Sequence, residues 1–119
     1  MSDRHHAVWP ENIPKHLSLP QTSLYTNLEV SALRYPQRDA INYYDSPITF
    51  SQLKQQVDAL AGYLQSLGVE KGDRVLLFMQ NAPQFTISYY AILRANAIVV
   101  PVNPMNRAAE LEHYLEDTE

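Results

Sequence analysis

The chain of 119 residues contains no cysteine and only three glycines, and each shortage excludes a class of site. Without cysteine the segment has no disulfide, no thiolate metal site and no thiol nucleophile. The glycine-rich phosphate loops GxGxxG and GxxxxGK are absent, as are the catalytic motifs GxSxG and HExxH. No catalytic, cofactor-binding or metal-binding residue is therefore assigned from the sequence.

Positive charge and long apolar runs are also scarce. Nine Lys and Arg residues stand against thirteen Asp and Glu, and no basic block occurs, so nucleic acid is not expected as a partner. The longest apolar run, residues 97–102, is much shorter than the roughly 20 residues of a membrane-spanning helix. The first residues, MSDRHH, lack the apolar core of a signal peptide. We expect a cytoplasmic protein without a transmembrane segment.

What the chain does contain is a strand-helix-strand pattern in its second half. Residues 74–79 and 97–102 are short apolar runs that predict two buried strands. Between them, residues 82–95 predict a helix, with Asn81 as its N-cap and Pro83 in its first turn. Its inward face carries Phe85, Tyr89, Ala91, Ile92 and Ala95. A βαβ unit of this kind places the two strands in parallel, which predicts a fold of the α/β class.

A helix and a hairpin are predicted ahead of that unit. Apolar residues recur at helical spacing from residue 23 to residue 35, and Pro36 stops the helix. Residues 40–44 and 48–50 are rich in β-branched and aromatic residues and predict a small hairpin around turn residues 45–47.

The longest predicted helix follows the hairpin. Thr49 and Gln52 have the spacing of a capping box, and the apolar positions that follow continue to Leu67. Gly68 is predicted to end this helix in a left-handed conformation, with Val69 packed against Leu64.

The two ends of the chain follow different patterns. Pro10, Pro14 and Pro20 predict an extended arm over residues 1–22, lying on its own domain or a neighbouring one and anchored by Trp9. At the other end, Asn106 is predicted to cap a last helix whose inward residues are Ala108, Leu111 and Leu115.

Histidine raises the question of a metal site in the arm. His5, His6 and His16 have no carboxylate or cysteine at ligand spacing, so a solvated role is the better interpretation. His113, on the last predicted helix, has no evident partner either.

Three places carry a second interpretation as part of a ligand site. Asn81 and the Asn103-Pro104 loop each follow a parallel strand, at the edge where α/β sheets bind ligands. Tyr89 and Tyr90 are candidates for lining a hydrophobic channel. In each case the structural interpretation (a cap, a connection, core aromatics) is favoured.

The order and spacing of these features resemble the N-terminal end of the adenylate-forming enzymes, and among them the fatty acyl-CoA synthetases. The resemblance covers about residues 23–119 and is carried by Tyr35-Pro36, Asp39-Ala40-Ile41, Ile48-Thr49-Phe50, Gly68-Val69, Gly72-Asp73-Arg74-Val75, Asn81, Ala97, Pro101-Val102-Asn103-Pro104 and Glu110-Leu111. Asn96 departs from the pattern, because the family usually has glycine before Ala97.

The resemblance implies that a carboxylate attacks the α-phosphorus of ATP, and that coenzyme A then displaces AMP to give a thioester. Mg²⁺ would offset the phosphate charge. The family's Lys-containing phosphate loop and its mobile C-terminal domain would lie downstream. Residues 23–119 are then the incomplete N-terminal part of an AMP-binding domain, acting as scaffold and inactive alone, and a strand pair with no further partner agrees with this.

Two alternatives remain open from the sequence. One is a free-standing α/β binding or interaction module, and the other is a relative that activates aryl or amino acids. A homo-oligomer is compatible with either.

Overall fold

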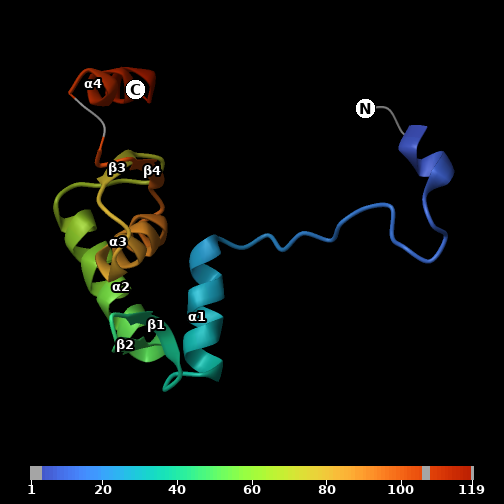
Figure 1. Cartoon of the computed structure of the whole chain (residues 1–119), viewed down its shortest axis with the longest axis horizontal. Helices are drawn as coiled ribbons and strands as arrows, with labels where there is room; N and C mark the ends of the chain where they lie inside the picture. The colour runs from blue at the N-terminus through green and yellow to red at the C-terminus, as the bar shows by residue number, and fades with distance from the viewer. Residues whose placement is uncertain (1–3, 106–107, 119) are drawn as a thin grey trace.

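The computed structural model describes residues 4–105 and 108–118 of the chain. A 3₁₀ helix, η1, precedes a mixed series of four α-helices and four strands within these ranges (Figure 1). Their bounds in chain order are η1 Arg4–Val8, α1 Leu24–Arg34, β1 Asp39–Tyr43, β2 Ser46–Thr49, α2 Phe50–Ser66, β3 Arg74–Phe78, α3 Pro83–Arg94, β4 Ile98–Val102 and α4 Ala108–Asp117.

Strands β1 and β2 form the predicted antiparallel hairpin, but its turn lies elsewhere. Tyr44 and Asp45 occupy the turn with φ of 48° and 59°, and Ser46 and Pro47 belong to β2. The prediction of a turn over residues 45–47 is therefore wrong at its start and end. Two successive left-handed residues match the right-handed twist of the strands, and this requirement outweighed the local preference of Ser-Pro for a turn.

Helix α2 is held at both ends by the predicted motifs. The Thr49 hydroxyl accepts from the Gln52 amide at 3.2 Å, and the Gln52 side chain accepts from the Thr49 amide at 3.0 Å. At the other end Gly68 has a φ of 97°, and Val69 N–H donates to the Leu64 carbonyl at 3.2 Å. The capping box and the glycine-terminated helix are both confirmed.

The βαβ unit is also confirmed: β3 and β4 run parallel, with Arg74 opposite Ile98 and Phe78 opposite Val102. Each element is one or two residues shorter than predicted. The interpretation of Asn81 as N-cap is wrong. The N-cap is Ala82, which makes no side-chain cap, and Pro83 takes the first helical position, where its fixed φ and missing N–H suit the helix start.

Helix α3, like α2, is followed by a residue in the left-handed conformation. Asn96 has a φ of 61°, and the Ala97 amide donates to the Ile92 carbonyl at 3.1 Å. The position therefore requires the backbone conformation that glycine adopts most easily, and asparagine is the common substitute. This explains why the departure at Asn96 leaves the fold intact.

Two clusters of buried side chains form the core. The first joins α1, α2 and α3, and its buried members are Tyr25, Leu28, Leu53, Val57, Ala61 and Ala91. The second lies between α3 and the β3–β4 pair and is built on Leu77, Ile92 and Ala97, with Phe85 and Tyr89 packed against it. The predicted inward face of α3 is thus confirmed.

Two expectations of burial are wrong. In β3 only Leu77 is buried, on the face that α3 covers, and in β4 only Val102 is buried, on the opposite face beside Phe78. Helix α4 was expected to turn Ala108, Leu111 and Leu115 inward, yet it has no buried residue among those described, and Leu115 is 48% exposed. The predicted cap Asn106 lies outside the described residues.

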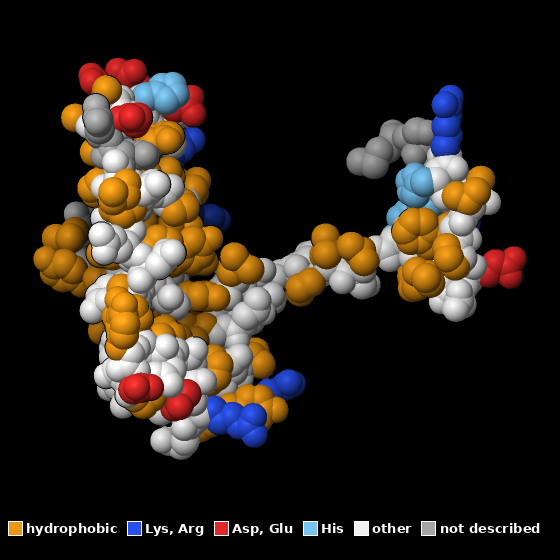
Figure 2. Space-filling model, viewed as in Figure 1, with side chains coloured by type: hydrophobic (Ala, Val, Ile, Leu, Met, Phe, Trp, Pro, Cys, Tyr) orange, Lys and Arg blue, Asp and Glu red, His pale blue; other side chains and the backbone are white. Residues whose placement is uncertain are grey.

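The arm extends away from the body of the molecule rather than lying on it, which corrects one expected placement (Figures 1 and 2). The radius of gyration is 18.6 Å, compared with about 13.5 Å for a compact chain of this length. Trp9 makes its hydrogen bonds within the arm, because its indole N–H donates to the carbonyls of Ile13 and Pro14 at 3.1 and 3.2 Å.

Candidate functional site

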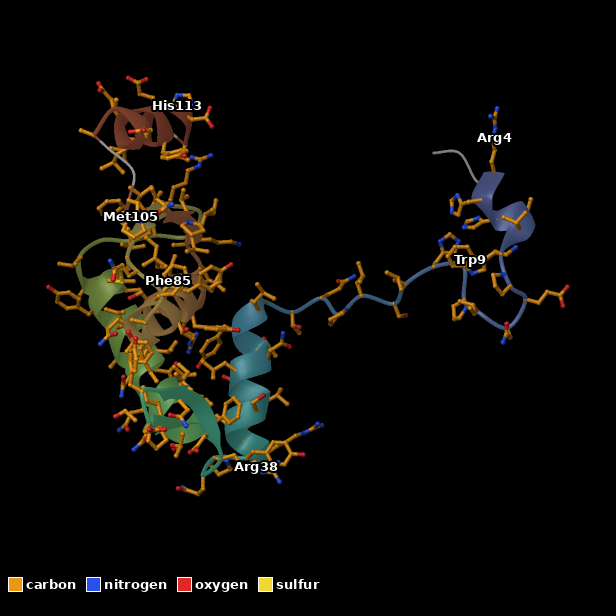
Figure 3. The ribbon with its side chains drawn as sticks, in the orientation of Figure 1. Arg4, Trp9, Arg38, Phe85, Met105 and His113 are labelled. Atoms are coloured by element: carbon orange, nitrogen blue, oxygen red, sulfur yellow. The ribbon has the colours of Figure 1, made fainter. Side chains whose placement is uncertain are left out.

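A cleft lies at the carboxyl ends of the parallel strands. Its volume is about 440 Å³, and it is lined by residues 79–81 after β3, by residues 101–104 at the end of β4, and by Phe85 of α3. Phe85 is labelled in Figure 3. Backbone polarity and open loops make this edge of an α/β sheet its usual ligand-binding side. Asn81 and Asn103 therefore come together at one cleft, as their shared position after parallel strands indicated.

The chemistry of the cleft is neutral. Among the residues that the structure describes, its lining combines apolar side chains with the amides of Gln80, Asn81 and Asn103 and includes no charged residue. The side-chain carbonyl of Asn103 is already engaged, because it accepts from the Met105 amide at 2.9 Å. Amides can accept and donate hydrogen bonds but cannot neutralise a triphosphate or replace the carboxylates that usually hold Mg²⁺. The residues described at this edge do not fit ATP–Mg²⁺.

A smaller cavity of about 260 Å³ continues from the cleft past Asn81 and Phe85 toward the hairpin. Beyond it, Tyr90 lines a cavity of about 220 Å³ between α1 and α3. Tyr89 packs in the second core cluster, and Tyr90 packs against the first. The two tyrosines therefore contribute to the core, and Tyr90 also borders a hollow.

A charged cluster that the sequence analysis missed joins three helices. The Asp58 carboxylate of α2 accepts from the Tyr25 hydroxyl of α1 at 2.5 Å and pairs with Lys54 at 2.6 Å. Arg94 of α3 lies 3.7 Å from the same carboxylate and stacks on the Tyr25 ring at 5.0 Å. The only signal in the sequence was the spacing of four residues between Lys54 and Asp58.

The cluster shifts the pKa of its members in directions that follow from its contacts. Burial alone would raise the pKa of Asp58, but the hydrogen bonds from Lys54 and Tyr25 outweigh burial and lower it. The hydrogen bond to Asp58 raises the pKa of Lys54. Burial, then the bond to Asp58, raises the pKa of Tyr25. The Asp58 carboxylate already accepts hydrogen bonds from Tyr25 and Lys54. Its role is therefore to link the helices rather than to accept a proton from a substrate.

The arm brings its histidines together around Trp9. The rings of His5 and His6 are 4.1 Å apart, and those of His6 and His16 are 5.5 Å apart. Within residues 4–105 and 108–118, no three His, Asp or Glu side chains form a group that could hold a metal ion. At the other end, His113 lies beside Tyr114 on α4, with ring centroids 6.1 Å apart.

None of the helices in the described ranges is both long and apolar enough to cross a bilayer.

Comparison with known proteins gives one consistent result. A long-chain-fatty-acid–CoA ligase of Bacillus subtilis is 42% identical over 113 residues, which cover 95% of this chain and 20% of that protein. A salicyl-AMP ligase / salicyl-S-ArCP synthetase of Mycobacterium tuberculosis is 41% identical over 97 residues, covering 77% and 17%. The chain thus spans about a fifth of the length of the curated relatives it matches.

The fold gives the same result as the sequence. The N-terminal subdomain of NpsA from Klebsiella oxytoca, solved in complex with 3-hydroxyanthranilyl-AMSN, superposes with a TM-score of 0.78 at 27% identity. The match covers 81% of this chain and 25% of that subdomain. Residues 28–119 match the family described as AMP-binding enzyme, and the chain belongs to that family.

Proposed function

We propose that this chain is a scaffold segment of an AMP-forming acyl-CoA ligase that activates a fatty acid. In that reaction the carboxylate displaces pyrophosphate from ATP, and the coenzyme A thiol then displaces AMP from the acyl-adenylate. Members of the family generally use ATP, Mg²⁺ and coenzyme A. The observation that carries the proposal is the 42% identity to the Bacillus subtilis ligase over 95% of the chain.

In this proposal the segment is part of the scaffold of the domain and supplies no catalytic group. The neutral cleft after β3 and β4 offers no group for the phosphates, so we propose that ATP, coenzyme A and the acid bind through residues that follow residue 119. In the same proposal residues 1–22 are an arm, residues 23–119 are the incomplete N-terminal part of the AMP-binding domain, and the protein is cytoplasmic.

The test is an assay of the complete protein with ATP, coenzyme A and either palmitate or salicylate. We expect palmitoyl-CoA and AMP in equal amounts, and no acyl-adenylate from the isolated 119 residues. Activity of the isolated segment would contradict the scaffold role. Absence of both products from the folded complete protein would favour the free-standing interaction module instead.

A second candidate is activation of an aryl acid. It is favoured by the 41% identity to the salicyl-AMP ligase of Mycobacterium tuberculosis. A higher kcat/KM for salicylate than for palmitate would select it. Reading the gene beyond the codon for residue 119 provides an independent check, because either ligase requires a Ser/Thr/Gly-rich loop with a lysine there.

A further inference from the structure

The arm exposes more apolar surface than it buries. Val8 and Leu17 are each 85% exposed, and Leu19 is 75% exposed. Ile13 is 48% and Trp9 37% exposed, and none of residues 4–22 is buried. Figure 2 shows apolar side chains gathered along the arm, away from the body of the molecule. A concentration of uncovered apolar side chains in one segment is typical of a surface that binds a protein or a membrane.

The body does not concentrate its exposed apolar side chains in this way. Its four most exposed ones lie on separate parts of the fold: Leu33 on α1, Tyr44 in the hairpin turn, Leu67 at the end of α2 and Met105 after β4. Exposed apolar side chains that are spread over a folded protein are ordinary and require no partner. The arm is therefore the part of the described chain whose apolar surface indicates binding.

Trp9 can leave water without losing a hydrogen bond. Its indole N–H donates to the carbonyls of Ile13 and Pro14, which belong to the arm itself. Because this donor is satisfied inside the arm, transfer of the ring to an apolar phase leaves no polar group unpaired. Tryptophan is also enriched at the surfaces of membranes, where one side of the ring is apolar and the other is wet.

The backbone limits how deeply the arm can enter a membrane. Residues 17–22 belong to no helix or strand. Backbone groups of such a segment are costly in the hydrocarbon interior, but water and headgroups satisfy them at the surface of a bilayer. Leu17 and Leu19 are two residues apart in an extended stretch, so they share one side and can enter the apolar layer together. The arm therefore suits the surface of a bilayer rather than its interior.

The distribution of charge favours an approach through the arm. Residues 1–22 contain two Lys or Arg and two Asp or Glu, so the net charge of −4 belongs to residues 23–119. Anionic headgroups repel an acidic body but not a neutral arm. The long side chains of Arg4 and Lys15 can reach phosphate groups while Val8 and Leu17 lie deeper. The arm projects from the body in Figure 1, so contact through the arm leaves the acidic body in water.

We propose that residues 4–22 bind the surface of a lipid bilayer. Val8, Trp9, Ile13, Leu17 and Leu19 enter the interfacial layer, and the body remains in solution. Because a few apolar side chains provide the attraction, the binding is peripheral and reversible. It does not depend on the reaction proposed above.

Flotation of the complete protein with vesicles tests the proposal. The vesicles contain phosphatidylcholine and phosphatidylglycerol in a ratio of three to one. We expect the wild type to float with them, and the double variant Leu17→Ser with Leu19→Ser to show a partition coefficient lower by at least about fivefold. The matched control is Leu33→Ser with Leu67→Ser, which removes two exposed leucines from the body and should change binding less than about twofold. Absence of wild-type binding, or equal binding by the two double variants, would overturn the proposal.

A fluorescent label places the contact within the complete protein. Leu19→Cys and Leu33→Cys are each labelled with an environment-sensitive dye after any cysteine beyond residue 119 has been replaced. Vesicles should shift the emission of the dye at residue 19 to shorter wavelength, and lipids with a spin label should quench it. The dye at residue 33 should respond to neither. If the protein floats but the dye at residue 19 does not respond, another part of the protein binds the lipid and the proposal is wrong.

Discussion

The Asp58 carboxylate on α2 contacts Tyr25 of α1 and Arg94 of α3 as well as Lys54 of its own helix. Replacing it with a neutral side chain removes the negative charge that these contacts share. Asp58→Asn loses the ion pair with Lys54 and weakens the bond from Tyr25. Because the Asp58 side chain is 35% exposed, solvent screens the pair, and the expected loss of unfolding free energy at pH 7 is about 1 kcal/mol. Chemical denaturation measures it, with Glu70→Gln, an exposed acidic residue in the turn before β3, as the control.

The unfolding free energy lost in Asp58→Asn depends on pH and becomes smaller as the pH falls. The folded-state pKa of Asp58 is below the usual aspartate value of 3.8, so the carboxylate stabilises the fold above that pH. Its contribution disappears as the pH falls through the folded-state pKa. The stability difference between wild type and Asp58→Asn should therefore narrow from pH 7 to pH 2.5. A difference that is constant over this range would rule out the carboxylate as its source.

Asn96 provides a second prediction at the level of a single residue. At its φ of 61° a side chain costs about 1 kcal/mol, less for Asn than for Ala. We expect unfolding free energy to fall in the order Gly, Asn, Ala at this position, with Asn96→Ala losing about 1 kcal/mol. Asn27→Gly in α1 is the control and should be destabilising, because a helical position gains nothing from glycine. If Asn96→Gly also destabilises, the left-handed assignment is wrong.

For the helices as elements, two N-termini offer a matched comparison. Thr49 caps α2 with its side chain, whereas Ser23 at the start of α1 makes no side-chain cap. Thr49→Ala should lower the unfolding free energy by about 1 kcal/mol and Ser23→Ala by less than about 0.5 kcal/mol. Urea denaturation of both variants checks this. Similar losses at the two sites would show that the reciprocal bonds of the capping box add little.

The elements themselves were largely predictable because their signals are local. The spacing of Thr49 and Gln52, Gly68 after Leu67, and the proline after Ala82 each act within a few residues. Asn81 failed as a cap because proline at the next position but one fixed the helix start instead. The hairpin turn failed because the twist of paired strands selected Tyr44 and Asp45 over Ser46 and Pro47.

The tertiary arrangement was harder to predict from sequence, since it depends on residues far apart. Asn81 and Asn103 meet at the cleft only because β3 and β4 pair in parallel. Asp58 meets Tyr25 and Arg94 across 33 and 36 positions, and no periodicity marks either contact. The apolar spacing in α4 predicted an inward face that the structure does not show, because spacing carries no information about which surface a helix contacts.

For the whole molecule, the arm and the body should be energetically separate. The bonds from Trp9 to the carbonyls of Ile13 and Pro14 lie inside the arm, which projects from the body in Figure 1. Deletion of residues 1–22 should change the unfolding free energy of the remaining chain by less than about 0.5 kcal/mol. Thermal and urea unfolding of the shortened protein measure this. A loss of several kcal/mol would show that the arm packs on the folded body.

The residues of the first core cluster are translated at different times, and this has a consequence while the chain is being synthesised. Tyr25, Val57 and Ala61 leave the ribosome well before Ala91, which is fully buried against them. At about 5–20 residues per second, the thirty residues from Ala61 to Ala91 take roughly 2 to 6 s to be translated. During that interval the nascent helices α1 and α2 expose the apolar surface that α3 later covers. Slow codons between these positions would lengthen the time in which a chaperone can bind it.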